Sequence, residues 1–175
     1  MLQTIALVVV AIVVAILLYA ATRPDNFRIE RAILIKAAPP KIFEFLEDFR
    51  RWGTWSPWEK LDPSMTRTHS GATSGVGAVY AWQGAGKVGA GRMEITQSSV
   101  PAKLVIKLDF LKPFEAHNTA EFTIEPRGDA TQITWAMHGP SPYMAKLMGI
   151  FFSMDTIVGR DFEAGLANLK AAAER

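Results

Sequence analysis

The sequence predicts an α+β protein in which an antiparallel β-sheet packs on a long C-terminal helix, with one transmembrane helix ahead of them. Three observations predict this arrangement. The N-terminal segment is apolar and uncharged, the middle of the chain alternates apolar and polar residues between turns with Gly or Pro, and the C-terminal segment has helical spacing. A length of 175 residues suits one well-packed domain.

The composition excludes several classes of function. A net charge of +2, without a run of basic residues, gives no reason to expect a nucleic-acid partner. The chain has no cysteine, which excludes disulfides, thiolate metal sites and cysteine nucleophiles. The absence of cysteine also fits a reducing compartment.

The apolar N-terminal segment is expected to span a membrane. From Ile5 to Ala21 no residue is charged, and with the preceding residues the run reaches about twenty residues, or about 30 Å of helix. A cleavable signal peptide is the rival interpretation. It would need a basic start and small residues before the cleavage site, where this chain has Leu18 or Tyr19. We therefore expect an uncleaved anchor that contacts the membrane through residues 2–21.

The charges that flank this span predict its orientation. Nothing positive precedes it except the terminal amine, and positive residues tend to stay on the cytoplasmic side. We therefore expect a single-pass protein of the cell membrane whose C-terminal domain is cytoplasmic. The positive residues that follow the span are Arg23, Arg28, Arg31 and Lys36.

A short linker joins the anchor to the rest of the chain. The segment "TRPDN", from Thr22 to Asn26, reaches at most about 17 Å, so the domain must lie against the lipid headgroups. The expected division of the chain is a transmembrane anchor at 1–22, a linker at 23–26 and one domain at 27–175.

The domain is expected to open with a strand and a helix. The strand covers Phe27 to Lys36, where apolar residues alternate, and Pro40 suits the first turn of the helix that follows. A segment with three tryptophans, "RRWGTWSPWEK", comes next and cannot be one regular element because it contains Gly53 and Pro57. The apolar face expected for the helix consists of Ile42, Phe45, Leu46 and Phe49.

Six short strands are expected in the middle of the chain. Each is separated from the next by a turn with Gly or Pro, and such short connections favour antiparallel neighbours. The alternation is clearest in "KLVIKLDF", and it predicts one apolar and one wet face for the sheet. The expected strands cover residues 65–70, 77–83, 91–98, 103–110, 116–125 and 130–139.

The C-terminal segment predicts a long helix with a break near Ser153–Asp155, where either end residue can cap the second piece. Its apolar stripe needs the apolar face of the sheet as a partner. The stripe consists of Met144, Leu147 or Met148, Phe151, Met154, Val158, Phe162, Leu166 and Leu169.

The domain resembles a known superfamily in the segments "APPKIFEFLEDFRRWGTWSPW", "VGAGRMEIT", "KLDFLKPFEAHNTAEFTIEPRGDATQITWAMHGP" and "DTIVGRDFEAGLANLK". It is similar to the START-like helix-grip (SRPBCC) superfamily, within the polyketide cyclase/dehydrase and lipid transport group. The resemblance implies a helix-grip fold, in which a curved antiparallel sheet wraps around the long C-terminal helix, with a cavity between them. Members include lipid carriers and cyclases, so the fold alone does not choose an activity.

Residues on the inner face of the expected sheet, in the tryptophan segment and on the C-terminal helix are candidates for lining such a cavity. Strand alternation places apolar and aromatic side chains on that face, and Gly89 and Gly91 would leave room there. The alternative is that these side chains simply fill the core. Trp52 is expected to anchor its loop, while two other tryptophans close the cavity. The candidate ligand-binding residues are Trp55, Trp58, Tyr80, Trp82, Met93, Phe110, Ala120, Phe122, Trp135, Met137, Phe151 and Met154.

The sequence contains no convincing catalytic constellation. His69, His117 and His138 fall on different expected strands, and the last two face outward by alternation. Glu94 shares the outer face with Arg92. The glycine-rich "GAGKVGAG" lacks the ending of a phosphate-binding loop and is a hairpin turn. We therefore expect no catalytic residue, no metal and no cofactor.

The leading hypothesis is a membrane-anchored binding domain for a hydrophobic small molecule or lipid held in an apolar cavity, with a monomeric soluble part. A tether this short would keep the cavity near lipid at high effective concentration. Two alternatives stay open. One is an enzyme of cyclase or dehydratase type, and the other is a protein-interaction or regulatory module with a filled core.

Overall fold

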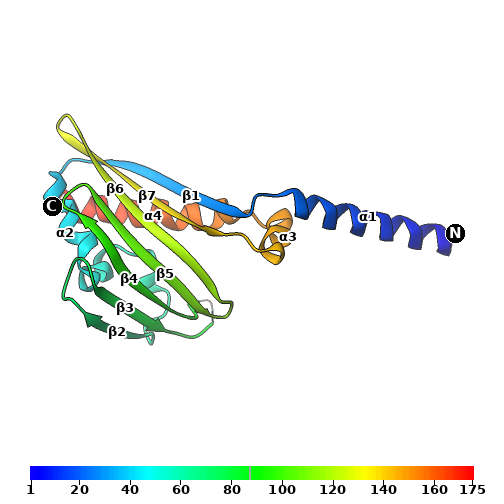
Figure 1. Ribbon diagram of the computed structural model, residues 1–175. Helices are drawn as coiled ribbons and strands as arrows, with labels where there is room; N and C mark the ends of the chain where they lie inside the picture. The colour runs from blue at the N-terminus through cyan, green and yellow to red at the C-terminus, as the bar shows by residue number, and fades with distance from the viewer. Residues whose placement is uncertain (87) are drawn as a thin grey trace.

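Seven antiparallel strands form one sheet that packs on a long C-terminal helix in the computed structural model, which describes residues 1–86 and 88–175 (Figure 1). Along the sheet the order is β1-β7-β6-β5-β4-β3-β2, so β2 to β7 form a meander and β1 lies beside β7. The α+β class expected from the sequence is confirmed. The strands are β1 (Asn26–Ile35), β2 (Thr66–Gly71), β3 (Ala78–Gln83), β4 (Ala90–Ser99), β5 (Lys103–Lys112), β6 (Ala116–Arg127) and β7 (Ala130–Pro140).

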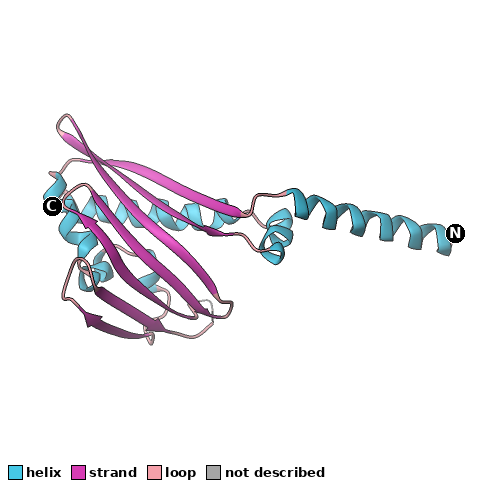
Figure 2. Cartoon of the chain, in the orientation of Figure 1, coloured by secondary structure: helices cyan, strands magenta, loops and turns pink. Residues whose placement is uncertain are grey.

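Helices occupy the two ends of the chain and the connection between β1 and β2. Figure 2 shows the strands as one twisted layer with the longest C-terminal helix running along it. Lys87, in the turn expected between β3 and β4, lies outside the described residues. The helices are α1 (Leu2–Thr22), α2 (Pro39–Glu47), the 3₁₀ helices η1 (Phe49–Thr54) and η2 (Pro57–Lys60), α3 (Tyr143–Phe151) and α4 (Met154–Ala173).

Two irregularities bend the sheet around α4. The pairing of β4 with β5 shifts register between Ala90 and Gly91, and again between Ile95 and Gln97. Register shifts of this kind add local twist and bend a strand. The sheet is therefore able to curve over the helix and to leave space beneath β3, β4 and β5.

Helix α4 is held to the sheet by side chains spaced along one of its faces. Phe162, Leu166 and Leu169 are buried in the core. The ring of Phe162 stacks on Trp135 of β7 at 4.2 Å between centroids and 7° between planes. Gly165 lets the helix approach, because a Cβ there would come within 2.8 Å of the Trp135 ring.

Helix α2 buries a slightly different face from the predicted one. It begins at Pro39, and Ile42 and Leu46 are buried as expected. The third buried side chain is Phe43, whereas Phe45 is only partly buried, with the Arg51 guanidinium 5.5 Å above its ring. Phe49 is buried as predicted, so the buried face is the predicted one widened by Phe43, because α2 packs against both the sheet and α4.

The C-terminal helical region breaks where the sequence predicts. Ser153 caps α4 by accepting a hydrogen bond from the backbone N–H of Thr156, at 3.2 Å. The prediction that one apolar stripe continues along both helices and faces the sheet is wrong, however. Because the chain is extended at Phe152, α3 turns away from the sheet and lies beside the end of α1.

Helix α1 projects from the domain as a single rod (Figure 1). It is long and apolar enough to cross a membrane, and Ala20, near its C-terminal end, is its buried residue. Its crossing of a membrane, and the division of the chain into anchor, linker and domain, stay predictions.

Candidate functional site

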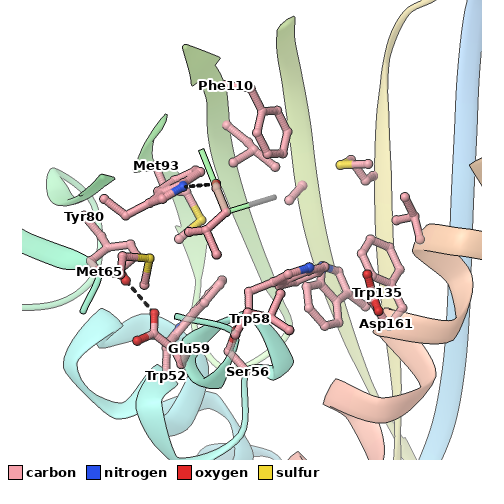
Figure 3. A pocket seen from close by; sticks show the side chains of 18 residues that line it. Trp52, Ser56, Trp58, Glu59, Met65, Tyr80, Met93, Phe110, Trp135 and Asp161 are labelled. Atoms are coloured by element: carbon pink, nitrogen blue, oxygen red, sulfur yellow. Dashed lines mark hydrogen bonds between the residues drawn. The ribbon is translucent and has the colours of Figure 1, made fainter. Parts of the chain in front are cut away.

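A cavity of about 270 Å³ lies between the inner face of the sheet, η2 and the N-terminal half of α4 (Figure 3). Its volume is close to the lower end of the range for small-molecule sites. Its wall is mostly apolar. The lining residues are Trp52, Ser56, Trp58, Glu59, Leu61, Met65, Tyr80, Trp82, Val88, Met93, Leu108, Phe110, Ala120, Trp135, Met137, Val158, Asp161 and Phe162.

Eight of the twelve predicted lining residues lie at the wall of this cavity. They come from β3 to β7 and share the inner face of the sheet, while Trp58 reaches in from η2. Whether a ligand contacts them stays a prediction. The predicted residues at the wall are Trp58, Tyr80, Trp82, Met93, Phe110, Ala120, Trp135 and Met137.

The other predicted lining residues lie elsewhere. Trp55 and Phe122 are fully buried in the core behind the wall, where their rings meet edge to face at 6.0 Å. Phe151 and Met154 are exposed to solvent, because α3 and the first turn of α4 extend past the sheet. Phe151 and Met154 were placed at the cavity by helical periodicity, which gives no information on where a helix leaves the core. Trp55 and Phe122 pack in the core without lining the cavity.

Of the three clustered tryptophans, Trp52 and Trp55 anchor their segment, and Trp52 and Trp58 line the cavity. The indole N–H groups of Trp52 and Trp55 donate to the backbone carbonyls of Leu46 and Phe45, each at 3.1 Å. Carbonyls at a helix end lack intrahelical partners, so these bonds tie η1 to α2. Trp58 instead enters the cavity, with its ring edge to face against Trp135 at 5.4 Å. The expected loop anchor at Trp52 is confirmed.

Trp82 forms part of the wall by lying against a glycine. A Cβ on Gly91 would come 2.4 Å from ring carbons of Trp82 and 2.6 Å from the carbonyl oxygen of Asp109. The indole N–H of Trp82 donates to the backbone carbonyl of Val88 at 3.2 Å, which fixes the ring. The space at Gly91 is therefore filled by tryptophan, whereas the sequence suggested room for a ligand. Gly89, at a φ of +61°, serves the turn.

One corner of the cavity is polar, and the sequence did not reveal it. The Glu59 carboxylate accepts hydrogen bonds from the Tyr80 hydroxyl and, at 2.7 Å, from Nε of Arg67. Arg67 also donates to the backbone carbonyls of Glu59 and Met65, at 2.8 and 2.7 Å. The charge of Glu59 is therefore balanced, and η2 is pinned to β2 and β3.

The environment of this corner sets the protonation of its groups. Burial, and then the hydrogen bond to Glu59, raise the pKa of Tyr80 well above its ordinary value. The hydrogen bond from Arg67 to Glu59 likewise raises the pKa of the guanidinium. Tyr80 is therefore a neutral hydroxyl donor and Arg67 a permanent cation. No local pattern joins η2 to β2, so sequence alone could not pair these residues.

The histidines lie apart, as expected from their strands. The ring of His69 lies 5.0 Å from Tyr80, His117 is hydrogen-bonded to Asp109 at 2.7 Å, and His138 lies 3.6 Å from Glu121. Within residues 1–86 and 88–175, no group of three or more His, Asp or Glu side chains could hold a metal ion.

Residues 26–174 match the sequence profile of one protein family, which is described as polyketide cyclase/dehydrase and lipid transport. No curated protein matches the sequence significantly. The matched segment begins with β1 and ends at the C-terminus of α4, so it covers the sheet, the cavity and the helix against it.

Solved structures with this architecture come from varied proteins. A protein from Chromobacterium violaceum has a TM-score of 0.60 at 11% identity, over 87% of this chain and 99% of its own. For Panax ginseng major latex-like protein 151 the TM-score is 0.61 at 12% identity, over 86% and 99%. For the di-domain ARO/CYC StfQ from the steffimycin biosynthetic pathway it is 0.66 at 12% identity, over 85% and 51%. At these identities the likeness shows the fold alone.

Replacing Gly91 with alanine is expected to destabilise the domain by about 1–3 kcal/mol, because the new methyl group must displace the Trp82 ring or the neighbouring strand. Urea denaturation followed by tryptophan fluorescence measures the free energy of unfolding. Gly53→Ala is the matched control, since a Cβ there meets no atom within 4 Å. It should change the free energy by less than about 0.5 kcal/mol. Equal effects of both changes would contradict the placement of Trp82.

Proposed function

Because this chain belongs to the polyketide cyclase/dehydrase and lipid transport family, we propose that it is a membrane-anchored binding domain for a hydrophobic small molecule or lipid. The family binds hydrophobic small molecules. The observation that carries the proposal for this chain is the cavity of about 270 Å³ with its apolar wall. The ligand contacts Trp58, Tyr80, Trp82, Met93, Phe110, Ala120, Trp135 and Met137 in this proposal.

The chemistry of the wall favours an apolar or neutral ligand. A molecule that buries about 300 Å² of apolar surface gains about 7 kcal/mol before the costs of association. The acidic side chains at the wall are Glu59 and Asp161, and Glu59 is already paired with Arg67. The described lining residues include no Lys or Arg that could pair with an anionic ligand. A neutral molecule needs no such partner and only has to fill the space.

An enzyme of cyclase or dehydratase type is less well supported. Such an enzyme needs an acid and a base that are free to exchange protons with the substrate. Among the described lining residues, Glu59 and Tyr80 are engaged with each other and Asp161 lies across the cavity on α4 (Figure 3). A filled-core interaction module is also less well supported, because the core of this domain contains a cavity.

The location follows from α1 and the charges after it. In this proposal residues 1–22 anchor the chain, residues 23–26 link, and residues 27–175 fold as the cytoplasmic binding domain. The short linker keeps the cavity close to the bilayer, where a hydrophobic ligand is most concentrated.

A single cysteine in place of Asp129, in the exposed turn between β6 and β7, is expected to report the orientation. The chain has no other cysteine, so a membrane-impermeant maleimide has one target. We expect no labelling in intact cells and full labelling after lysis, because positive residues follow the span. Labelling before lysis would contradict a cytoplasmic domain. A mature protein shorter by about twenty residues would instead identify a cleaved signal peptide.

Filling the cavity should abolish binding without unfolding the domain. Ala120 lies on β6 at the cavity wall, so Ala120→Phe is expected to leave the melting temperature unchanged and to remove uptake of Nile red, a neutral apolar fluorophore. In a close-packed core the same change would cost about 1–3 kcal/mol. Ala81→Phe, on the outer face of β3, is the matched control and should preserve binding. A stable Ala120→Phe protein that still binds Nile red would contradict the proposed site.

A further inference from the structure

Helix α3 has the reverse of the amphipathic pattern that water favours. Met144, Met148 and Phe151 are 64%, 53% and 65% exposed, whereas Lys146, the one charged residue of the helix, is only 8% exposed. A helix at the surface of a soluble domain buries its apolar stripe and exposes its charges. The surroundings that α3 faces are therefore expected to be apolar and not water.

Lys146 lies on the buried side of α3 and joins this helix to the linker after α1. Its ammonium group donates to the carboxylate of Asp25, which follows α1 in the linker. This hydrogen bond, and the positive charge that makes it, lower the pKa of Asp25 below its usual value. The single charge of α3 thus holds this helix to the linker residue Asp25. The exposed apolar side chains of α3 then point away from the domain.

The contact between α3 and α1 also fixes the depth at which α3 lies. The Tyr143 hydroxyl donates to the backbone carbonyl of Leu17 at 2.9 Å. Leu17 precedes the end of α1 at Thr22 by five residues, which is about 7.5 Å along a helix. With the end of the proposed span at the membrane surface, Tyr143 of α3 therefore lies about this far below that surface. Helices that lie in the membrane surface are buried by about 5–10 Å. Tyr19 and Tyr143 are both exposed here, as tyrosines at a membrane interface often are.

We infer that α3 and the first turn of α4 form a second membrane-contact surface, with the lipid bilayer as its occupant. This inference rests on the proposed crossing of the membrane by α1. The apolar surface continues from α3 into α4 through Met154 and Ile157, which are 52% and 53% exposed. It is continuous with the proposed span at one end of the domain (Figure 1).

Strand register brings a second apolar element to this end of the domain. Asn26 of β1 pairs with Pro140 of β7, so the start of β1 and the end of β7 lie at one end of the sheet. The start of β6 lies at the same end, because β6 and β7 are antiparallel. The turn from β5 to β6, which follows the pair of Phe110 with Ala116, is therefore at that end as well. That turn carries Phe114, which is 79% exposed. Phe114 therefore adds an exposed apolar side chain at the end of the domain from which α1 leaves.

The membrane-contact surface leads to the rim of the cavity. Met154, Val158 and Asp161 follow one another on α4 at spacings of four and three residues, so they share a face of the helix. Val158 and Asp161 line the cavity (Figure 3). With α3 in the bilayer surface, the rim of the cavity lies next to lipid.

The test uses the full chain in vesicles of phosphatidylcholine and phosphatidylglycerol, with the fluorophore NBD on single cysteines. Met148→Cys reports on α3, Val10→Cys on α1, and Asp129→Cys on the far end of the domain. Lipids with a spin label near the headgroup should remove about half or more of the Met148 signal, because interfacial helices lie at that depth. Spin labels deep in the acyl chains should act most strongly at Val10, and neither lipid should affect Asp129.

The three positions separate the possible failures. Quenching at Val10 without quenching at Met148 would overturn the inference while leaving the proposed anchor intact. An apolar emission at Met148 that spin-labelled lipids do not quench would also overturn it, because a second protein copy would then cover α3. The absence of quenching at Val10 would overturn the anchor and this inference together.

Discussion

The stacking of Phe162 on Trp135 is the contact on which the rest of the structure depends. The two ring centroids lie 4.2 Å apart, and this stack fixes the separation of α4 from the sheet. Toward the C-terminus of α4, Leu166 and Leu169 close the core. Toward its N-terminus, the ring of Trp58 contacts Trp135 and Phe162 edge to face. This ring separates η2 from the sheet, and the cavity lies between them.

Much of the architecture could be predicted from local patterns. Alternation along strands is a two-residue period, so the inner face of β5, β6 and β7 could be assigned before any contact was known. This is why Ala120, Phe110 and Met137 were placed on the cavity side. The break between α3 and α4 was predictable for a similar reason, because a capping residue such as Ser153 marks a helix start by its own chemistry.

Features that depend on how separate elements pack against each other could not be predicted. The pairing of Arg67 with Glu59 joins β2 to η2, and the approach of Trp82 to Gly91 joins β3 to β4. Periodicity finds an apolar stripe on a helix but does not tell whether that stripe faces a core or a bilayer. Phe151 and Met154 were assigned to the cavity for that reason, although α3 and the first turn of α4 carry these side chains outward.

Native mass spectrometry of the gently purified full chain shows whether the cavity contains a hydrophobic molecule, as we propose. We expect one bound hydrophobic molecule per chain, released on denaturation and identifiable by its mass. A chain that carries no such molecule, and that takes none up after incubation with a total lipid extract, would contradict it.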